Sequence, residues 1–443
     1  MALIRNYEDS LAYLSSFSKQ GAPVKDLSRF TALAHALGDP QNGLKCIHIV
    51  GTNGKGSTAE FIARSLQYCG YKTGRFTSPY IIDIRERITF DGEFIPREDF
   101  ARLTERVAEA AGKCMDNGFS QFEILTAVCF LWFAEVGAEY CVIEAGIGGT
   151  LDCTNIIPTP EAAVITSIGL DHTAILGRTE AEIAKSKSGV IKGRSAVAAA
   201  GISESAMDVL RERCESVGAR LIVPDVSLLN IEKCGLAGSD FCYRGREFHV
   251  SLCGRHQIGN AMTALEVLNN ISGGNIFSED NKSSSKVTYE NVRRGISDAA
   301  MPARLEQFPP KDGLPHIILD GGHNPQAMNA AREVLSSDAR KKTALIGMID
   351  TKDYETALRI ILPCFERVFF VDGFAPNAVR AETLCAVGER LGKQCRAAHD
   401  IAGGVVSAAE MTAQGGVLFI GGSLYMAAEA RKALLGENGN ENA

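Results

Sequence analysis

The sequence lacks the features that would place its protein in a membrane, outside the cell or on a nucleic acid. The most apolar run, residues 124–134, is too short to span a bilayer and predicts a buried helix. The first residues show no signal-peptide pattern, so we expect a cytoplasmic protein. The formal net charge is −7, and no long run of like charge interrupts the chain. This balance argues against a general binder of nucleic acids or membrane surfaces.

Paired-cysteine motifs are absent as well. The thirteen cysteines are scattered along the chain, and no two of them form a Cys-x-x-Cys pair. Their number is odd, and several, such as Cys46, Cys129 and Cys141, stand in apolar stretches. They predict reduced thiols in a cytoplasmic core and argue against disulfides or structural zinc.

The length and the order of the apolar segments predict an α/β protein of two domains. At 443 residues the chain is too long for one ordinary core, and its 45% apolar and 22% charged residues are typical of a globular protein. Apolar runs that predict strands alternate with helical patterns, and the alternation restarts near residue 300. We predict a mostly parallel sheet in a phosphate-loop domain over 1–300 and a smaller doubly wound, Rossmann-like domain over 301–443. Loops are expected around 21–23 and 272–285.

One glycine-rich stretch carries the most chemical information. Residues 51–58 read GTNGKGST, after an apolar run at 46–50 and before an apolar helical face. Glycines let backbone N–H groups approach an anion, and the N-terminus of a helix adds positive potential. Lys55 would then reach the terminal phosphates of a nucleotide, and Ser57 would offer a hydroxyl to Mg²⁺. The alternative is a turn that only joins a strand to a helix.

Polar residues follow other predicted strands, at the sheet edge where open α/β sheets bind ligands. Glu144 and His172 could hold Mg²⁺, although histidine is an unusual ligand for this ion, or they could cap a helix and bond within a loop. Asp320 and His323 could face the nucleotide from the second domain or cap a turn. Lys187, between two serines, could be an ordinary surface lysine. The pattern predicts an ATP- or GTP-using enzyme with its site between two domains and leaves the second substrate open.

Ordered motifs run along nearly the whole chain. They are HIVGTNGKGS at 48–57, TSP at 77–79 with ERI at 86–88, FEILTA at 122–127, EAGIGG to LDCTN at 144–155, ITSIGLDH to LG at 165–177, HQIGNA at 256–261, DGGHNP at 320–325 and GSLY at 422–425. Together they resemble the folylpolyglutamate synthase and dihydrofolate synthase family of the Mur ligase superfamily, in its bacterial bifunctional form. The extra glycine after Lys55, which the common phosphate loop lacks, is part of this resemblance.

The resemblance implies an ATP-dependent acid–amino-acid ligase of folate biosynthesis and one-carbon metabolism. ATP would phosphorylate the carboxylate of 7,8-dihydropteroate or of a reduced folate, and the amine of L-glutamate would attack the acyl phosphate. Activation is needed because a free carboxylate is a poor acceptor for an amine. The resemblance also implies Mg²⁺, with K⁺ as a further candidate cation, and a cytoplasmic monomer without nucleic-acid or membrane partners.

The resemblance assigns roles to individual residues. The catalytic set would be Lys55, Glu144, His172 and Lys187, the last of them carbamylated. The expected metal ligands are Ser78, Glu144 and His172. The expected ATP contacts are Gly51, Thr52, Asn53, Gly54, Lys55, Gly56, Ser57, Asn260, Arg304, Asp320 and His323. The expected pterin-side contacts are Phe122, Glu123, Leu151, Asp152 and Cys153.

Five positions depart from the family's usual pattern. Tyr80 stands where histidine is frequent and Thr150 where arginine is frequent. Ser186 and Ser188 flank the expected carbamylated lysine in place of glutamate and alanine. Ala303 replaces a glycine just before the arginine expected to contact ATP. These departures leave open the substrate preference and the surroundings of the carbamylated lysine.

Three functions therefore stay under consideration. The first is the bifunctional synthase, the second a folylpolyglutamate synthase that acts only on reduced folates, and the third a nucleotide-binding relative without ligase activity. Intact Lys55, Glu144, His172 and Lys187 argue against the third. A peptidoglycan-precursor ligase is disfavoured by the folate-type TSP and DGGHNP motifs.

Overall fold

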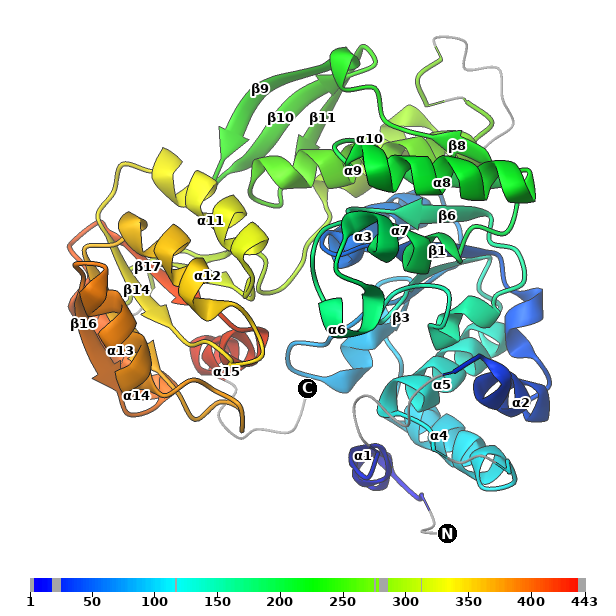
Figure 1. Ribbon diagram of the computed structural model, residues 1–443, viewed down its shortest axis with the longest axis horizontal. Helices are drawn as coiled ribbons and strands as arrows, with labels where there is room; N and C mark the ends of the chain where they lie inside the picture. Colours follow the sequence, from blue (N-terminus) through cyan, green and yellow to red (C-terminus); the bar gives the residue numbers. More distant parts are fainter. Residues whose placement is uncertain are drawn as a thin grey trace.

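The chain forms two bodies of mixed helices and strands that lie side by side (Figure 1). A computed structural model describes residues 4–17, 25–115, 118–274, 276–278, 286–311 and 313–436. The loop expected around 21–23 and part of the one expected at 272–285 lie outside these residues. Within the described ranges, the search for a helix of membrane-spanning length and apolarity finds none.

The first body is built on an eight-stranded sheet in the order β4-β3-β2-β5-β1-β6-β7-β8. Its pairs are parallel except for β2 with β3 and β3 with β4. The strand order reverses at β1, so this strand lies at the switch point where such sheets bind ligands. The strands are β1 (Cys46–Val50), β2 (Thr73–Phe76), β3 (Ile88–Phe90), β4 (Glu93–Phe94), β5 (Tyr140–Glu144), β6 (Ala162–Ile165), β7 (Ser195–Ala198) and β8 (Arg220–Ile222).

Helices cover both faces of this sheet. Side chains alternate along β1, so Ile47 and Ile49 pack under α3, α9 and α10, while Cys46 and Val50 face the helices of the opposite side. The helices are α1 (Tyr7–Ser15), α2 (Ser28–Ala36), α3 (Lys55–Tyr68), α4 (Arg97–Ala111), α5 (Gln121–Glu135), α6 (Thr173–Leu176), α7 (Glu180–Ser188), α8 (Glu204–Val217), α9 (Arg255–Ile271) and α10 (Tyr289–Ser297).

A three-stranded antiparallel sheet extends the first body at its upper end (Figure 1). Its strands are β9 (Leu229–Gly235), β10 (Gly238–Tyr243) and β11 (Arg246–Val250). Phe241, Tyr243 and Phe248 from this sheet are buried in the same core as α3 and α9. The small sheet therefore completes the first body and is part of its core.

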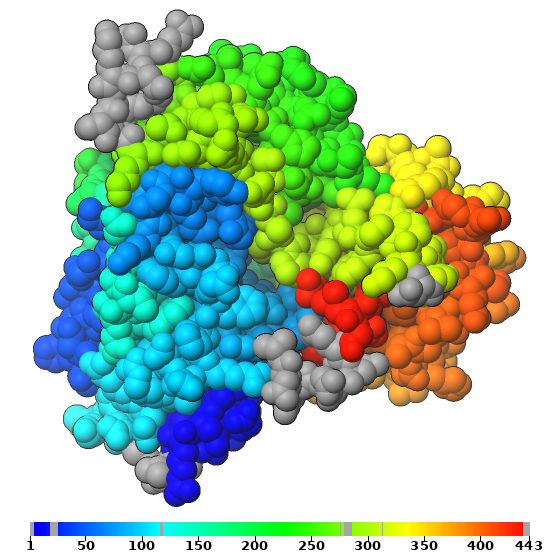
Figure 2. Space-filling view, turned by 180° about the vertical axis from the view of Figure 1, so that it is seen from behind, coloured from blue at the N-terminus to red at the C-terminus, as the bar shows by residue number. Residues whose placement is uncertain are grey.

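The second body contains a six-stranded sheet in the order β12-β13-β17-β14-β15-β16, in which only β12 is antiparallel. Figure 2 shows it from behind, with the orange and red C-terminal residues beside the blue and green earlier ones. Helices α11 to α13 pack on one face and α14 and α15 on the other. The strands are β12 (Glu306–Phe308), β13 (His316–Asp320), β14 (Lys342–Ile346), β15 (Arg367–Val371), β16 (Gln394–Ala398) and β17 (Val417–Gly421); the helices are α11 (Pro325–Ser337), α12 (Tyr354–Ile361), α13 (Ala381–Arg390), α14 (Ile401–Glu410) and α15 (Leu424–Leu435).

The local sequence explains where several elements begin. Ser120 and Glu123 form a capping box at the start of α5, and Thr179 and Glu182 form another at α7, the helix that carries Lys187. The fold class expected from the sequence is confirmed: a mostly parallel sheet in the larger N-terminal body and a smaller α/β body after it. All thirteen cysteines are free thiols, as expected.

Candidate active site

A cleft of about 700 Å³ lies between the two bodies, where β1, β5 and β6 end. The turns that follow these strands line it from one side, and residues of the second body line it from the other. Every residue expected to hold the metal, to contact ATP or to take part in catalysis lines this cleft. Groups from distant parts of the sequence therefore share one cavity.

Two glycines keep the backbone of the turn after β1 free of side chains. Gly54 has a φ of +83°, and a Cβ added there would lie 2.4 Å from the Asn260 Oδ1 atom. A Cβ added at Gly51 would lie 2.0 Å from the Thr166 Oγ1 atom. Only glycine fits at either position. Helix α3 begins directly after Gly54, with Lys55 as its first residue. This geometry matches a phosphate-binding loop at a helix N-terminus.

Hydrogen bonds fix this turn to its surroundings. Thr52 Oγ1 donates to the Gly169 carbonyl oxygen at 3.0 Å, and the Asn53 backbone N–H donates to Ser167 Oγ at 2.9 Å. Asn53 also donates its side-chain amide to Gln326 Oε1 of the second body, at 2.6 Å. The turn is thus anchored to the residues after β6 and touches the opposite wall of the cleft.

Two lysines converge on one backbone carbonyl. Lys187 Nζ donates to the Gly51 oxygen at 2.9 Å and Lys55 Nζ donates to the same oxygen at 3.3 Å. Lys187 is 3% exposed, which excludes a surface lysine. Burial and the neighbouring Lys55 ammonium lower the pKa of Lys187 to about 7. A sizeable fraction of the Lys187 side chain is therefore a neutral, nucleophilic amine near neutral pH.

Glu144 ends β5 with its carboxylate enclosed beside the phosphate loop. It is 2% exposed, its Oε1 atom lies 3.7 Å from Lys55 Nζ, and its Oε2 atom accepts a hydrogen bond from the Ser78 backbone N–H at 3.2 Å. Burial raises the pKa of Glu144, and the charges of Lys55 and Arg304 oppose this rise. Glu144 thus places a carboxylate, a ligand type that Mg²⁺ accepts, directly beside the phosphate loop.

His172 stands at the mouth of the cleft in the left-handed region, with a φ of +48°. Its side chain is 41% exposed, and its Nε2 atom lies 4.0 Å from Asp171 Oδ2, beyond hydrogen-bond distance. Burial of the ring lowers the pKa of His172, so the neutral imidazole, which can ligate a metal, prevails at neutral pH. Asp171 instead accepts a hydrogen bond from Lys352 Nζ of the second body at 2.9 Å.

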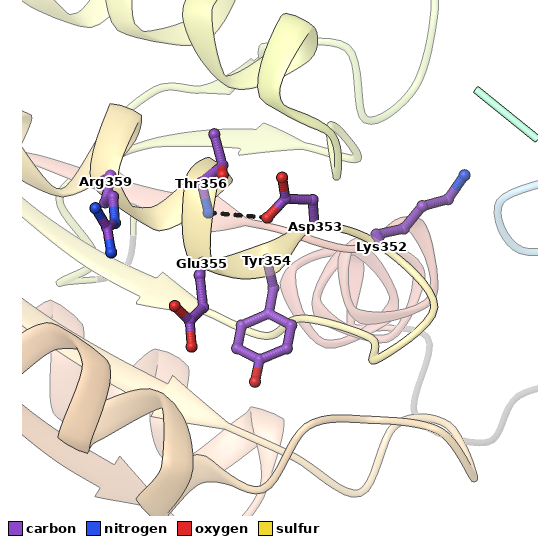
Figure 3. Close-up of a pocket in the computed structure, with 6 residues that line it drawn as sticks. All are labelled: Lys352, Asp353, Tyr354, Glu355, Thr356 and Arg359. Atoms are coloured by element: carbon purple, nitrogen blue, oxygen red, sulfur yellow. Dashed lines mark hydrogen bonds between the residues drawn. The ribbon is translucent and has the colours of Figure 1, made fainter. Parts of the chain in front are cut away.

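A second depression, of about 380 Å³, lies at the start of α12 and contains Lys352 (Figure 3). Asp353 accepts a hydrogen bond from the Thr356 backbone N–H at 3.1 Å and caps the helix. Lys352 extends away from the other five lining residues, whereas Tyr354 and Glu355 lie under the helix (Figure 3). The amine of Lys352 therefore lies in the cleft between the bodies, whereas its backbone lines the depression.

The second body brings Arg304, Asp320 and His323 to the cleft, opposite Asn260. Asp320 is buried, which raises its pKa, while the Arg304 charge opposes this rise. Its Oδ2 atom accepts a hydrogen bond from the Gly322 N–H at 3.1 Å. His323 Nδ1 lies 3.1 Å from the Gly321 oxygen. Their contact with ATP stays a prediction.

Two of the unusual residues contact each other. The Thr150 N–H and Oγ1 both donate to the Ser186 carbonyl oxygen, at 2.7 and 2.8 Å. The turn after β5 is thereby attached to α7, next to Lys187. Ser188 Oγ donates to the Lys185 oxygen at 3.0 Å within the same helix. These contacts show how the chain accommodates threonine and serines around the lysine.

The expected pterin-side residues do not line the cleft. Glu123 pairs with Arg29 at 3.0 Å, and Cys153 Sγ donates to Thr126 Oγ1 at 3.3 Å. Asp152 accepts hydrogen bonds from the backbone N–H groups of the turn after β5, and Leu151 is 45% exposed. A Cβ added at Gly146 in that turn would lie 2.9 Å from the Phe122 ring. Of the five, Asp152 and Phe122 contact this turn, and the contact of all five with a pterin stays a prediction.

The described residues contain no group of three or more His, Cys, Asp and Glu side chains that could hold a metal by themselves. Ser78, Glu144 and His172 provide one hydroxyl, one carboxylate and one imidazole. Mg²⁺ commonly takes one or two carboxylates and completes its shell with phosphate oxygens and water. A sparse protein set of this kind suits a metal that arrives with a nucleotide.

Asp171, Gln326 and Lys352 are among the cleft residues that the sequence did not select as site residues. Asp171 was noted only as part of a motif, and Lys352 follows shortly after β14 at a strand end. The strand-end argument that selected Glu144 and Asp320 could have selected Lys352. Gln326 lies inside α11, and the sequence offers no signal for its contact with Asn53.

Family models cover both bodies. Residues 49–268 match the Mur ligase middle domain and residues 303–424 match the glutamate ligase domain of Mur ligases. The chain is 31% identical to a folylpolyglutamate synthase of Lacticaseibacillus casei over 97% of the chain and 99% of that protein. It is also 31% identical to a dihydrofolate synthase/folylpolyglutamate synthase of Bacillus subtilis, over 97% and 99%.

Solved structures agree with this comparison. The Mycobacterium tuberculosis folylpolyglutamate synthase complexed with ADP and AMPPCP superposes with a TM-score of 0.84 at 27% identity, covering 98% of the chain and 100% of that structure. The Thermotoga maritima folylpolyglutamate synthase superposes with a TM-score of 0.82 at 29% identity, covering 98% of each chain.

Proposed function

The chain belongs to the folylpolyglutamate synthase and dihydrofolate synthase family of Mur ligases, and we propose that it adds L-glutamate both to 7,8-dihydropteroate and to reduced folates, with conversion of ATP to ADP and phosphate. The observation that carries this proposal is the convergence of Lys55 and Lys187 on the Gly51 carbonyl oxygen, with the Glu144 carboxylate 3.7 Å from Lys55 Nζ, in a cleft that Arg304 also lines. The division into domains over 1–300 and 301–443 stays a proposal.

In the first step a carboxylate oxygen of the folate substrate attacks the γ-phosphorus of ATP, and ADP leaves. The backbone of residues 51–54 and the Lys55 ammonium neutralise phosphate charge as it shifts towards the leaving group. Arg304 brings a second positive charge from the other wall. Gln326 and Lys352 contact the first body and help to hold the walls together, which excludes water from an intermediate that water would hydrolyse.

In the second step the neutral amine of glutamate attacks the carbonyl carbon of the acyl phosphate. An amide bond forms, inorganic phosphate leaves with the bridging oxygen, and the amine loses a proton. Holding the three substrates in one cleft makes this attack effectively unimolecular. The departing phosphate takes that proton, so the products are the amide and HPO₄²⁻.

We propose Ser78, Glu144 and His172 as the residues that hold Mg²⁺. When bound, the ion would supply charge to offset that of the phosphates. The residues fit this role because Glu144 is a buried carboxylate beside the phosphate loop and His172 is neutral. K⁺ is a further cation to vary in the assay.

We propose that Lys187 is carbamylated. Its amine would attack CO₂ and release one proton, which requires the neutral form that burial and Lys55 favour. The carbamate is an anion, so it would replace the repulsion between Lys187 and Lys55 by attraction. The remaining N–H could still donate to the Gly51 oxygen.

The proposal is tested by incubating the purified protein with ATP, Mg²⁺, L-glutamate and either 7,8-dihydropteroate or tetrahydrofolate. ADP formation with both supports the bifunctional synthase, and formation with tetrahydrofolate alone supports the monofunctional enzyme. No turnover with either acceptor would contradict both and leave a nucleotide-binding relative. We further propose that the active form is a cytoplasmic monomer, which light scattering and fractionation would check.

A further inference from the structure

Arg304 stands between two residues in an unfavourable backbone conformation. Ala303 has a φ of +52° and Leu305 a φ of +50°, and both side chains are buried. Residues other than glycine, asparagine and aspartate rarely adopt this left-handed region, because the Cβ atom approaches the carbonyl oxygen. Such strain persists only where the surrounding structure enforces it, and it often marks a functional position.

Three hydrogen bonds enforce this conformation. The Ala303 N–H donates to Glu306 Oε2 at 2.9 Å, and the Gly321 N–H donates to the Ala303 carbonyl oxygen at 2.8 Å. The Leu305 N–H donates to Asp320 Oδ1 at 3.2 Å. Both strained residues are therefore held by a carboxylate, each on its own side of Arg304.

Glu306 is itself held by a paired arginine. Arg431 of α15 donates Nε to both Glu306 oxygens, at 3.1 and 3.0 Å, and Nη2 to Oε1 at 3.0 Å. This fork geometry fixes a carboxylate more rigidly than a single contact would. About a fifth of each side chain is exposed, so the pair is largely shielded from water.

The hydrogen bonds at Ala303 and Leu305 fix the backbone on both sides of Arg304. Its side chain lines the cleft, and its charge opposes the raised pKa of both Glu144 and Asp320. Glycine adopts a positive φ without the Cβ penalty. Alanine at position 303 therefore needs a restraint that glycine would not need.

We propose that Glu306, locked by Arg431, is a positioning residue that keeps Arg304 directed at the nucleotide phosphates by holding Ala303 in the left-handed conformation. The inference rests on the proposed function, in which Arg304 contacts ATP. Glu306 acts through the backbone of Ala303 and does not touch the nucleotide.

The test measures binding of AMPPCP to the full-length protein by titration calorimetry. Glu306→Ala is expected to weaken binding about tenfold, since the left-handed conformation loses its restraint. Adding Ala303→Gly to that variant should restore most of the lost affinity. In an Arg304→Ala background, Glu306→Ala should cause no further loss of affinity, because both residues act through the contact of Arg304 with the nucleotide.

A matched control is Glu366→Ala, which removes the exposed ion pair with Lys341 in the same body and should leave affinity unchanged. If the Glu306→Ala protein shows no cooperative thermal transition and is therefore not folded, the Glu306→Gln variant is measured in its place. Glutamine keeps an acceptor for the Ala303 N–H and loses the charge that Arg431 holds, so a smaller loss, again reversed by Ala303→Gly, is expected.

Three results would overturn the positioning role of Glu306 alone. They are wild-type affinity for AMPPCP in Glu306→Ala, no recovery of affinity on adding Ala303→Gly, or an equal loss of affinity when Glu306→Ala is made in the Arg304→Ala background. A wild-type protein that binds no AMPPCP would overturn the nucleotide site, and with it the positioning role of Glu306. The two failures are therefore distinguishable.

Discussion

Lys352 and Asp171 form an ion pair across the cleft, with 2.9 Å between Nζ and Oδ1. About a fifth of each side chain is exposed, and burial would raise the pKa of Asp171, but Lys352 and neighbouring donors hold it below its usual value. Because Asp171 directly precedes His172, the pair ties the position of the proposed metal ligand to the docking of the second body.

Lys352→Met should loosen this docking. Losing this partly shielded ion pair should weaken docking of the second body by about 1 kcal/mol. We therefore expect about a fivefold loss of kcat/KM for ATP and a larger radius of gyration by small-angle scattering. Lys341→Met, which removes an exposed pair within the second body, is the matched control. An unchanged radius together with unchanged kinetics would show that the pair does not govern docking.

The pH dependence should follow Lys187. Its pKa is about 7 in the folded chain against 10.5 as the ordinary value, so the unfolded chain binds more protons between these values. The free energy of unfolding of the uncarbamylated protein should therefore rise with pH across that window and fall as the pH drops. Carbamylation should likewise increase as the pH rises through 7, which ¹³C NMR with labelled bicarbonate would detect.

Lys187→Arg provides the control for this pH dependence, because a guanidinium stays protonated and forms no carbamate. We expect it to lose the ¹³C signal and about a hundredfold of its ligase rate, in the range seen when a fixed charge aimed at a transition state is removed. A carbamate signal of equal strength in the variant would place the modification on another lysine.

Gly54→Ala should prevent nucleotide binding. The added Cβ would meet the Asn260 amide at 2.4 Å in a residue whose φ is +83°. Gly70→Ala is a close match, since Gly70 has a φ of +75° and no neighbouring atom within 4 Å. That control should lose only about 1–2 kcal/mol of stability through strain and should bind AMPPCP normally. Equal binding by both variants would argue against a close approach of phosphate to this turn.

A buried chain of hydrogen bonds behind the cleft should be sensitive to Thr154. Thr154 Oγ1 donates to Asp152 Oδ1 at 2.5 Å, so His48 Nε2, at 2.8 Å, must donate to Thr154. Burial lowers the pKa of His48 to about 3, which agrees with a neutral ring. Thr154→Val should cost about 1–3 kcal/mol by leaving buried groups unpaired, whereas Thr154→Ser should cost little. Equal thermal shifts for the two would contradict this chain.

The sequence predicts the regular parts of this protein well because they depend on local patterns. The apolar run before the phosphate loop, at 46–50, coincides with β1. Strands β3, β4, β12 and β16 were not anticipated. They are short or partly exposed, and Gln394–Ala398 contains no β-branched or aromatic residue.

Contacts between the two bodies were largely beyond prediction. Motif resemblance selected Lys55, Glu144 and Lys187, which the structure brings together, although spacing alone left Glu144 undecided. The bonds from Asn53 to Gln326 and from Asp171 to Lys352 join residues far apart in the sequence. Their pairing depends on how the two bodies dock, which no local pattern encodes.

Transfer of labelled oxygen tests the central claim, activation of a carboxylate by phosphorylation, most directly. The protein would be given 7,8-dihydropteroate with ¹⁸O in its carboxylate, together with ATP, Mg²⁺ and L-glutamate, and the released phosphate would be examined by mass spectrometry. The attacking oxygen leaves with phosphate when the amide forms, so each phosphate should contain one ¹⁸O atom. Phosphate free of the label would show that no acyl phosphate forms and would contradict the account.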